Sequence, residues 1–241
     1  MKLNGGLKRF SKIIDKYEVR EYIKNRIGEE YLNPIYGVYD NAKDIDFNKL
    51  PDKFVIKLNN GSGYNFICKD KSKIDKDKLV KRFNRWLKID FYKECKEIQY
   101  KNVKSKLICE RYMEDSSGEL RDYKFFCFEG KVKFIQVDNG RFSNHTQDMY
   151  DIDWNKINLN FGYRASNLSE ERPKKLLEMI KISENLSRDL PFARIDLYYV
   201  DNRIYFGEIT FTPQNGLKSF KPVKADKDIA NMIKLDKYKK V

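Results

Sequence analysis

Apolar and polar residues alternate most clearly between Phe192 and Pro213, in the segment FARIDLYYVDNRIYFGEITFTP. Aromatic and β-branched residues dominate both arms, and Asp201-Asn202 in the middle is typical of a tight turn. This stretch is therefore predicted to be a β-hairpin. The same criteria predict further strands at residues 33–39, 54–58, 64–68, 107–113, 121–128 and 131–137.

Helical periodicity predicts helices at residues 15–27, 75–88 and 169–189. Asp15 has the position of a cap for the first, with Glu18 completing a capping box. Ser169 is expected to cap the third, with Pro173 tolerated in its first turn. The second helix is predicted to turn its apolar side inward and to leave a solvated basic side. The basic residues are Lys76, Lys78, Lys81, Arg82, Arg85 and Lys88.

Two other stretches have no clear period. Residues 138–168 are polar and irregular, and they are expected to form a long functional loop near the second-substrate site, anchored by Trp154. After Pro213 the chain is Lys-rich, and it is expected to be a helix or coil. Strands and helices together indicate an α+β fold.

The predicted hairpin carries four polar residues in an apolar setting: Arg194, Asp196, Glu208 and Thr210. Residues two apart in a strand share a face, so each pair points together. A two-residue turn alone would set Asp196 opposite Gly207 and leave Glu208 on the other face. A bulge or a three-residue connection would align all four, and we predict that alignment.

An alignment of this kind has a chemical consequence. Two carboxylates on one face repel unless a cation lies between them or one keeps its proton. Their oxygen atoms are suited to Mg²⁺. An ordinary hairpin with a solvated charged face is the alternative.

The sequence A-R-I-D-L, a hairpin, then E-I-T-F-T-P resembles the C-terminal metal-binding hairpin of the ATP-grasp fold. More narrowly, it resembles that of the TupA-like ATP-grasp proteins associated with bacterial cell-surface polysaccharide synthesis. The resemblance implies that Asp196 and Glu208 hold Mg²⁺ on the nucleotide phosphates and that Arg194 stabilises the transferring γ-phosphate. Thr210 stands where many members have a metal-ligating Asn, so the metal is expected to rely more on water.

Two earlier segments fit the same order. The segment DKYEVR resembles the D-K-x-x-x-K/R opening of ATP-grasp cores, which assigns Lys16, and secondarily Arg20, to the nucleotide phosphates. The strand at 54–58 then runs into Asn59-Asn60-Gly61-Ser62-Gly63. Glycines let a backbone approach phosphate, and Ser62 adds a hydroxyl. Asn-Gly is also a common hairpin turn, and the absence of G-K-[ST] excludes a Walker-type loop.

Five residues of these two segments are therefore expected to bind the nucleotide. The phosphate-binding residues are Lys16, Lys57, Gly61, Ser62 and Gly63.

Two later strands complete the resemblance. Glu110 is expected to face the adenine amino group, with Tyr112 and Met113 lining the pocket, although a core strand with an exposed Glu explains each residue equally well. Asp122, or else Glu119, is expected to bind the ribose hydroxyls. The resemblance implies that Lys124 lies nearer the reacting groups, and Lys124 is expected to have a catalytic role together with Arg194.

The resemblance implies an ATP-grasp fold with two lobes whose antiparallel sheets clasp ATP, and a reduced N-terminal domain. Residues 1–50 would be an N-terminal helical and extended segment. Residues 51–109 would be the small lobe with its Gly-rich flap, and residues 110–241 the C-terminal lobe with the metal-binding hairpin. Because little precedes Asp15, a partner subunit or a polymeric substrate could complete the site, and a homo-oligomer is a further possibility.

The implied activity is an ATP- and Mg²⁺-dependent carboxylate–amine ligase that acts through an acyl phosphate. Its substrates would be a carboxylate and an amine, such as an amino acid and an anionic glycan precursor. A kinase of a sugar or small molecule would use the same residues. A glycosyltransferase would need a nucleotide-sugar site, and no D-x-D occurs in a Rossmann-like setting.

Composition bears on whether the protein binds nucleic acid or a membrane. The chain has 241 residues and a net charge of +13, which allows for a nucleic-acid-binding module. Lysines are scattered, and no zinc finger, RRM signature or dense basic arm is present, so nucleic acid is not expected. No apolar run is long enough to span a membrane and no signal-peptide core is seen, so a cytoplasmic protein is expected.

The cysteines and the histidine do not indicate a disulfide, a zinc site or a catalytic centre. The four cysteines lack C-x-x-C spacing, so buried thiols are expected rather than disulfides or zinc ligands. His145, the single histidine, is assigned to a surface or structural role ahead of a catalytic one.

Overall fold

The computed structural model describes residues 6–115, 118, 120–140, 145–167 and 169–234. These residues form two compact units. The first, here called the flap unit, is Leu7–Tyr22 with Leu32–Met113. The second, here called the hairpin unit, is Ile23–Tyr31 with the described residues from Glu114 onward.

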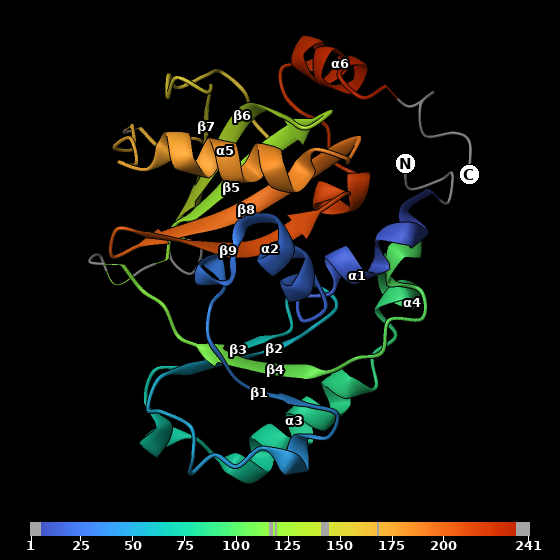
Figure 1. The fold of residues 1–241 in the computed structure, drawn as a ribbon, viewed down its shortest axis with the longest axis vertical. Helices are drawn as coiled ribbons and strands as arrows, with labels where there is room; N and C mark the ends of the chain where they lie inside the picture. Colours follow the sequence, from blue (N-terminus) through green and yellow to red (C-terminus); the bar gives the residue numbers. More distant parts are fainter. Residues whose placement is uncertain (1–5, 116–117, 119, 141–144, 168, 235–241) are drawn as a thin grey trace. The chain divides into compact units, whose positions relative to one another are not determined.

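The flap unit contains a four-stranded antiparallel sheet in the order β1-β4-β2-β3. Its strands are β1 (Ile35–Tyr39), β2 (Phe54–Leu58), β3 (Asn65–Cys68) and β4 (Leu107–Arg111). Its helices are α1 (Ser11–Ile14), α3 (Lys76–Leu87) and α4 (Phe91–Cys95), and the first part of α2 (Val19–Ile27) also belongs to it. Helix α3 lies along one face of this sheet (Figure 1).

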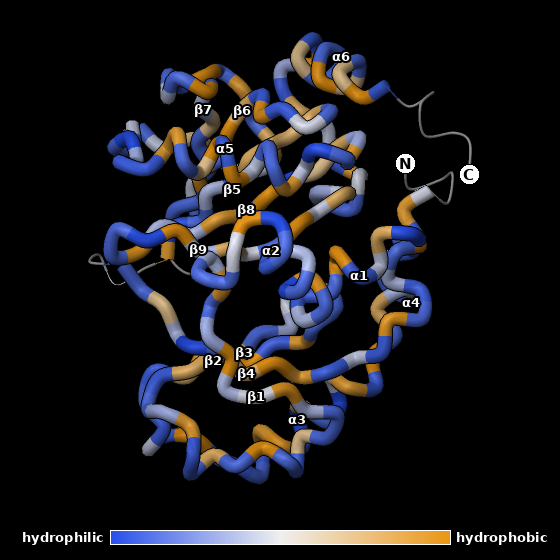
Figure 2. Tube along the Cα trace, in the orientation of Figure 1, coloured by the Kyte–Doolittle hydropathy of each residue, from blue (hydrophilic) through white to orange (hydrophobic). Residues whose placement is uncertain are grey.

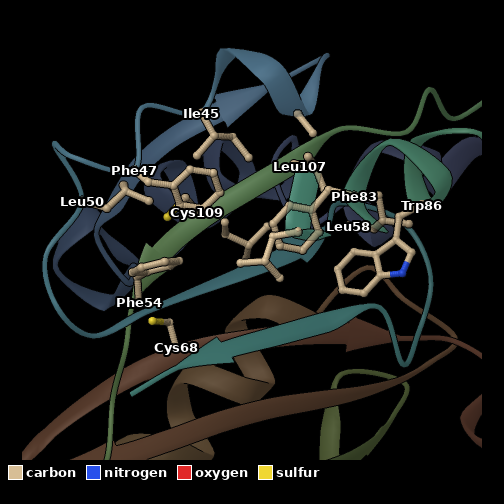
Figure 3. Packing of buried hydrophobic residues seen from close by; sticks show 13 residues of the cluster. Ile45, Phe47, Leu50, Phe54, Leu58, Cys68, Phe83, Trp86, Leu107 and Cys109 are labelled. Atoms are coloured by element: carbon tan, nitrogen blue, oxygen red, sulfur yellow. The ribbon is translucent and has the colours of Figure 1, made fainter. Parts of the chain in front are cut away.

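The predicted helix at 75–88 is confirmed, with Asp75 as the N-cap, where its side chain accepts a hydrogen bond from the Lys78 amide at 2.9 Å. Its apolar side packs Phe83 and Trp86 against Phe54, Leu58 and other buried residues of the sheet (Figure 3). Hydrophilic and hydrophobic positions alternate along this helix in Figure 2. Burial of one apolar stripe is what holds a helix of this length to a sheet.

The hairpin unit contains a five-stranded antiparallel sheet in the order β7-β6-β5-β8-β9. Its strands are β5 (Asp122–Phe128), β6 (Lys131–Asn139), β7 (Thr146–Tyr150), β8 (Phe192–Val200) and β9 (Arg203–Thr210). Helix α5 (Leu176–Ser187) covers one face (Figure 1), where the Cys127 thiol lies 3.8 Å from the Ser183 carbonyl oxygen. Helix α6 (Val223–Asn231) comes last.

Short 3₁₀ segments precede or connect these elements, at Gly6–Phe10, Glu29–Tyr31, Ala42–Asp44, Lys71–Lys73, Ile98–Tyr100 and Pro213–Gly216. The two sheets with their covering helices confirm the α+β class. Within the described residues, no helix combines the length and the apolar character that a bilayer crossing requires.

The register of the β8–β9 hairpin confirms the predicted bulge. Asp201 and Asn202 both have positive φ, 49° and 58°, and form a two-residue turn between Val200 and Arg203. The pairing then shifts by one, so that Leu197 faces Phe206 and Asp196 faces Glu208. Gly207 is the extra residue, and a side chain there would begin 2.9 Å from the Asp196 carbonyl oxygen.

Two helix boundaries differ from prediction. The third helix begins at Leu176 and not at Ser169, because Pro173 disfavours the α conformation of the residue before it. Asp15 does cap a turn, accepting hydrogen bonds from the Tyr17 and Glu18 amides at 2.8 and 3.1 Å, but regular α2 begins at Val19.

The prediction of an irregular loop at 138–168 was also partly wrong, because this segment contains strand β7 at the edge of the sheet. Trp154 is an anchor as predicted. Its ring stacks on Tyr150 at 4.4 Å, and its indole N–H donates to the Glu170 carbonyl oxygen at 3.0 Å. The four cysteines are free and buried, as expected.

Candidate functional site

The face of the five-stranded sheet opposite α5 has an aromatic part around Phe126 and Phe128 and a polar part, here called the polar face. On β5, Asp122 and Lys124 lie on this face, because Cys127 and the other residues of opposite parity point toward α5. Cross-strand pairing adds Asp196 beside Lys124, and Glu208 beside Asp196. Most of this row is buried, so its charges act on one another in a medium of low polarity.

Arg194, Asp196, Glu208 and Thr210 meet on this face. The Arg194 guanidinium donates to both oxygens of Asp196 at 2.7 Å, and its Nη2 also donates to Glu208 Oε1 at 3.1 Å and Thr210 Oγ1 at 3.2 Å. The Thr210 hydroxyl donates to Glu208 Oε1 at 3.2 Å. The cation that must separate two facing carboxylates is therefore supplied, in this state of the protein, by Arg194.

Lys124 is a second internal cation. Its side chain is 5% exposed, and its ammonium group contacts Asp122, Asp138 at 3.3 Å and Asp196 at 3.4 Å. Burial lowers the pKa of Lys124, but the Asp122 and Asp196 carboxylates outweigh that effect and raise it. Lys124 therefore stays charged and links the strands β5, β6 and β8.

The same burial acts on the carboxylates. It raises the pKa of Asp196 to about 6, although Arg194 and Lys124 act in the opposite direction. On this face Asp122, Asp138, Asp196 and Glu208 stand against two cations, Lys124 and Arg194. An additional cation at this face would reduce the remaining charge imbalance.

The ligand atoms here suit magnesium. Asp196, Glu208 and Thr210 present only oxygen, which Mg²⁺ prefers. Among the residues the structure describes, no group of three or more His, Cys, Asp or Glu has a metal-binding arrangement. A metal at the Asp196–Glu208 pair would thus keep several water or phosphate ligands, as Mg²⁺ commonly does.

In the flap unit, Lys16 lies against the glycine loop. Its ammonium group donates to the Gly61 carbonyl oxygen at 2.6 Å, and its amide donates to the Asn59 carbonyl oxygen at 2.8 Å. Gly61 has φ +91° and would meet Phe91 at 2.8 Å if it had a Cβ, so glycine is required there. Ser62 and Gly63 at the tip are exposed.

The base of this loop is fixed. Asn59 Oδ1 accepts from the Lys106 amide at 2.7 Å, and Asn60 Nδ2 donates to the Val103 carbonyl oxygen at 3.3 Å. Asn59 and Asn60 are thereby tied to the segment before β4, whereas Ser62 and Gly63 are exposed; that this loop acts as a flap stays a prediction.

Lys57 and Glu110 form an ion pair, with Lys57 Nζ 2.7 Å from Glu110 Oε2. Asn33 Nδ2 donates to the same Glu110 oxygen at 3.4 Å, and the Arg20 guanidinium donates to the Asn33 carbonyl oxygen at 2.9 Å. Burial lowers the pKa of Arg20, and Glu110 partly offsets that effect. This group lies on the sheet face opposite α3, because Phe54, Ile56 and Leu58 of β2 take the α3 side.

The remaining predicted residues lie near the ends of these strands. Tyr112 follows β4, and its ring is 5.7 Å from Lys53 Nζ and 5.6 Å from Lys69 Nζ. Met113 is half-buried beside it. Glu119, the alternative to Asp122 for ribose, lies outside the described residues.

Three polar residues on the polar face were not predicted. Gln136 and Asp138 on β6 and Gln147 on β7 are buried, and both amides donate to Asp138 at 3.1 Å. Asp138 faces Asp122 because a bulge near Lys133 shifts the β5–β6 register. A plain two-residue turn at Glu129-Gly130 would have placed Asp138 on the other face, so alternation alone could not reveal it.

Comparison with known proteins identifies the family and the fold. A family model described as TupA-like ATPgrasp matches residues 1–234. Two crystal structures of D-alanine–D-alanine ligase from Bacillus anthracis are similar in fold, one of them complexed with ATP. The ATP complex gives a TM-score of 0.52 at 16% identity, over 92% of this chain and 65% of that one.

The second structure gives a TM-score of 0.51 at 17% identity, over 94% of this chain and 66% of that one. The chain therefore spans just under two-thirds of the length of these ligases. A search of curated proteins finds no match.

Proposed function

Because the chain belongs to the TupA-like ATP-grasp family, we propose that it is an ATP- and Mg²⁺-dependent carboxylate–amine ligase. The observation that carries the proposal is the alignment of buried Asp196 with the partly exposed Glu208 on one face, with Arg194 bound to both. The reaction would convert a carboxylate to an acyl phosphate, which an amine then attacks.

The polar face of the hairpin unit supplies what phosphoryl transfer needs. That chemistry depends on positioning and charge neutralisation more than on covalent help from the protein. Asp196, Glu208 and Thr210 would hold Mg²⁺, which when bound neutralises charge on the phosphate oxygens. Arg194 Nη2, which donates to Glu208 and Thr210 at 3.1 and 3.2 Å, would then be released from these two partners and could donate to the transferring group.

Lys124 fits a supporting role. Its three carboxylate contacts fix Asp196 in place from the β5 side. In the flap unit, Lys16, Lys57 and the loop from Gly61 to Gly63 would bind the remaining phosphates. Their positive charges and the exposed loop tip are suited to that anion.

For the substrates, we propose an amino acid or other amine joined to a carboxylate-bearing glycan precursor of the cell surface. Support comes from the family's link to surface polysaccharides and from the net charge of +13, which favours acidic substrates. Asp122, with Glu110, Tyr112 and Met113, would contact the nucleoside.

A screen for acyl phosphate formation tests the proposal. The full chain is incubated with ATP and Mg²⁺, a panel of amino acids and uronic acids, and hydroxylamine, which traps an acyl phosphate as a hydroxamate. A ligase yields hydroxamate that depends on one carboxylate, and Glu208→Gln abolishes it.

Glu171→Gln is the matched control, since Glu171 is exposed in the same unit and the chemical change is identical. A stable phosphorylated product without hydroxamate would instead identify a kinase. Equal hydroxamate from Glu208→Gln and wild type would disprove the assignment of the metal pair.

A further inference from the structure

The basic side of α3 forms a single exposed stripe. The α3 basic stripe is defined as Lys78, Lys81, Arg82, Arg85 and Lys88, all exposed. Their spacing of three or four residues places them within about a third of the helix circumference and along about 15 Å of its axis. The opposite side, with Leu79, Phe83 and Trp86, is buried in the core of the flap unit.

Three lysines of the stripe have no carboxylate partner among the described residues. Many other exposed lysines pair with a carboxylate, for example Lys24 with Glu29, and Lys104 with Asp40. In the described part of the chain, Lys78, Lys81 and Lys88 form no ion pair within 4.0 Å. Unpaired cations in one line produce a local positive potential that a solvated, internally paired surface does not.

Apart from its positive charges, the α3 basic stripe presents few groups that could recognise a ligand. The one neutral polar side chain nearby, Asn84, accepts a hydrogen bond from the Ala42 amide at 3.2 Å and serves the fold. Phe83 and Trp86 are buried, so the helix presents no ring on which a base or sugar could stack. The guanidinium group of Arg82 lies 4.7 Å from the centre of the Trp86 ring, so this residue also makes a cation–π contact within the protein.

We propose that the α3 basic stripe docks the protein onto the surface of an anionic lipid bilayer. A flat anionic surface can contact all of the stripe at once, because the helix is convex and its cations lie on one side. The apolar side of α3 is committed to the core, so the contact is electrostatic and superficial, without insertion.

A membrane bound to the α3 basic stripe would not cover the candidate site residues of the flap unit. Lys57 and Glu110 lie on the sheet face opposite α3. A change at the stripe should therefore alter membrane binding and leave ATP turnover in solution as it is. The inference does not depend on which reaction the protein catalyses.

Co-sedimentation of the full chain with vesicles tests the proposal. The vesicles are phosphatidylcholine alone, or phosphatidylcholine with about 30% phosphatidylglycerol, because the latter carries the negative surface potential that basic residues sense. Wild type should bind only the anionic vesicles, and about 300 mM salt should remove most of that binding.

The test variant is Lys78→Gln/Lys81→Gln/Lys88→Gln. Each basic residue near an anionic membrane contributes about a fivefold gain in partitioning, so the triple variant should bind about 100-fold more weakly. Its control is Lys174→Gln/Lys181→Gln/Lys227→Gln, which removes the same charge from exposed lysines of the hairpin unit and should bind as wild type does. If the triple variant does not fold, the single change Lys81→Glu serves instead.

Three results would overturn the proposal. Equal losses in the two triple variants would show that only net charge matters. Equal binding to neutral vesicles would exclude an electrostatic contact. Salt-sensitive binding to an acidic polysaccharide or to RNA, with none to the anionic vesicles, would assign the stripe to another polyanion.

Discussion

Replacing Gly207 by alanine should disturb the alignment on which the candidate metal site depends. A Cβ at this position would lie 2.9 Å from the Asp196 carbonyl oxygen and 3.1 Å from Tyr198 Cε2. The first neighbour is backbone on the strand that carries Asp196, so the strain cannot be relieved by rotating a side chain. Overpacking of this kind costs about 1–3 kcal/mol of folding free energy.

The strain is relieved in one of two ways: either β9 moves away from β8, or the pairing reverts to the unbulged register. Both change how the Asp196 and Glu208 carboxylates lie relative to each other. In the second case residue 207 would face Asp196, and Glu208 would turn to the α5 side of the sheet. We therefore expect Gly207→Ala to weaken Mg²⁺–ATP binding as well as stability.

Urea denaturation and titration calorimetry with Mg²⁺–ATP measure the two effects. The control is Gly130→Ala, at the β5–β6 turn, where a Cβ would lie 3.0 Å from the Arg188 Cα. It should lose stability while keeping its affinity for nucleotide. An unchanged urea midpoint and an unchanged affinity in Gly207→Ala would refute the role assigned to the bulge.

Three more predictions follow from burial. Phe83→Ala, which empties a fully buried position in the flap-unit core, should lower the free energy of unfolding by about 3–5 kcal/mol in urea titrations. Burial raises the pKa values of Cys109 and Cys127 to about 12, so iodoacetamide at about pH 8 should label neither until the protein is unfolded, and rapid native labelling would contradict their burial. Because burial raises the pKa of Asp196 from 3.8 to about 6, this carboxyl group keeps its proton to a higher pH in the folded state than in the unfolded chain. Without metal, stability should therefore fall as pH rises from about 4 to about 6, relative to Asp196→Asn, and the reverse slope would contradict it.

Much of the fold could be predicted because local signals were strong. Helix α3 has a cap at Asp75 and a full apolar stripe, and both β8 and β9 alternate around a turn that tolerates positive φ. The pairing of Asp196 with Glu208 followed once a bulge was assumed, and Gly207 marks its place.

Other features depend on tertiary context that no single segment carries. Strand β7 contains buried Gln147 and Asp148, so its period is hidden, and it is fixed by pairing with β6. The partner of Glu110 turned out to be Lys57 on the neighbouring strand, a contact set by sheet register. Asp138 reaches the polar face only through the second bulge.

The residue assignments of the candidate site remain proposals that binding experiments can decide. Lys124, for example, was assigned a catalytic role from its position on β5. Its burial against Asp122, Asp138 and Asp196 shows that it at least holds the polar face together.

The most direct test of the central claim is the affinity of the full chain for ATP, measured by titration calorimetry with and without Mg²⁺. If Asp196 and Glu208 hold the metal, Glu208→Gln should weaken Mg²⁺-dependent binding by at least about tenfold, as loss of a metal-supporting group commonly does. Metal-free binding should change little, and Glu171→Gln should match wild type. The same Mg²⁺-dependent affinity in wild type and Glu208→Gln would contradict the claim.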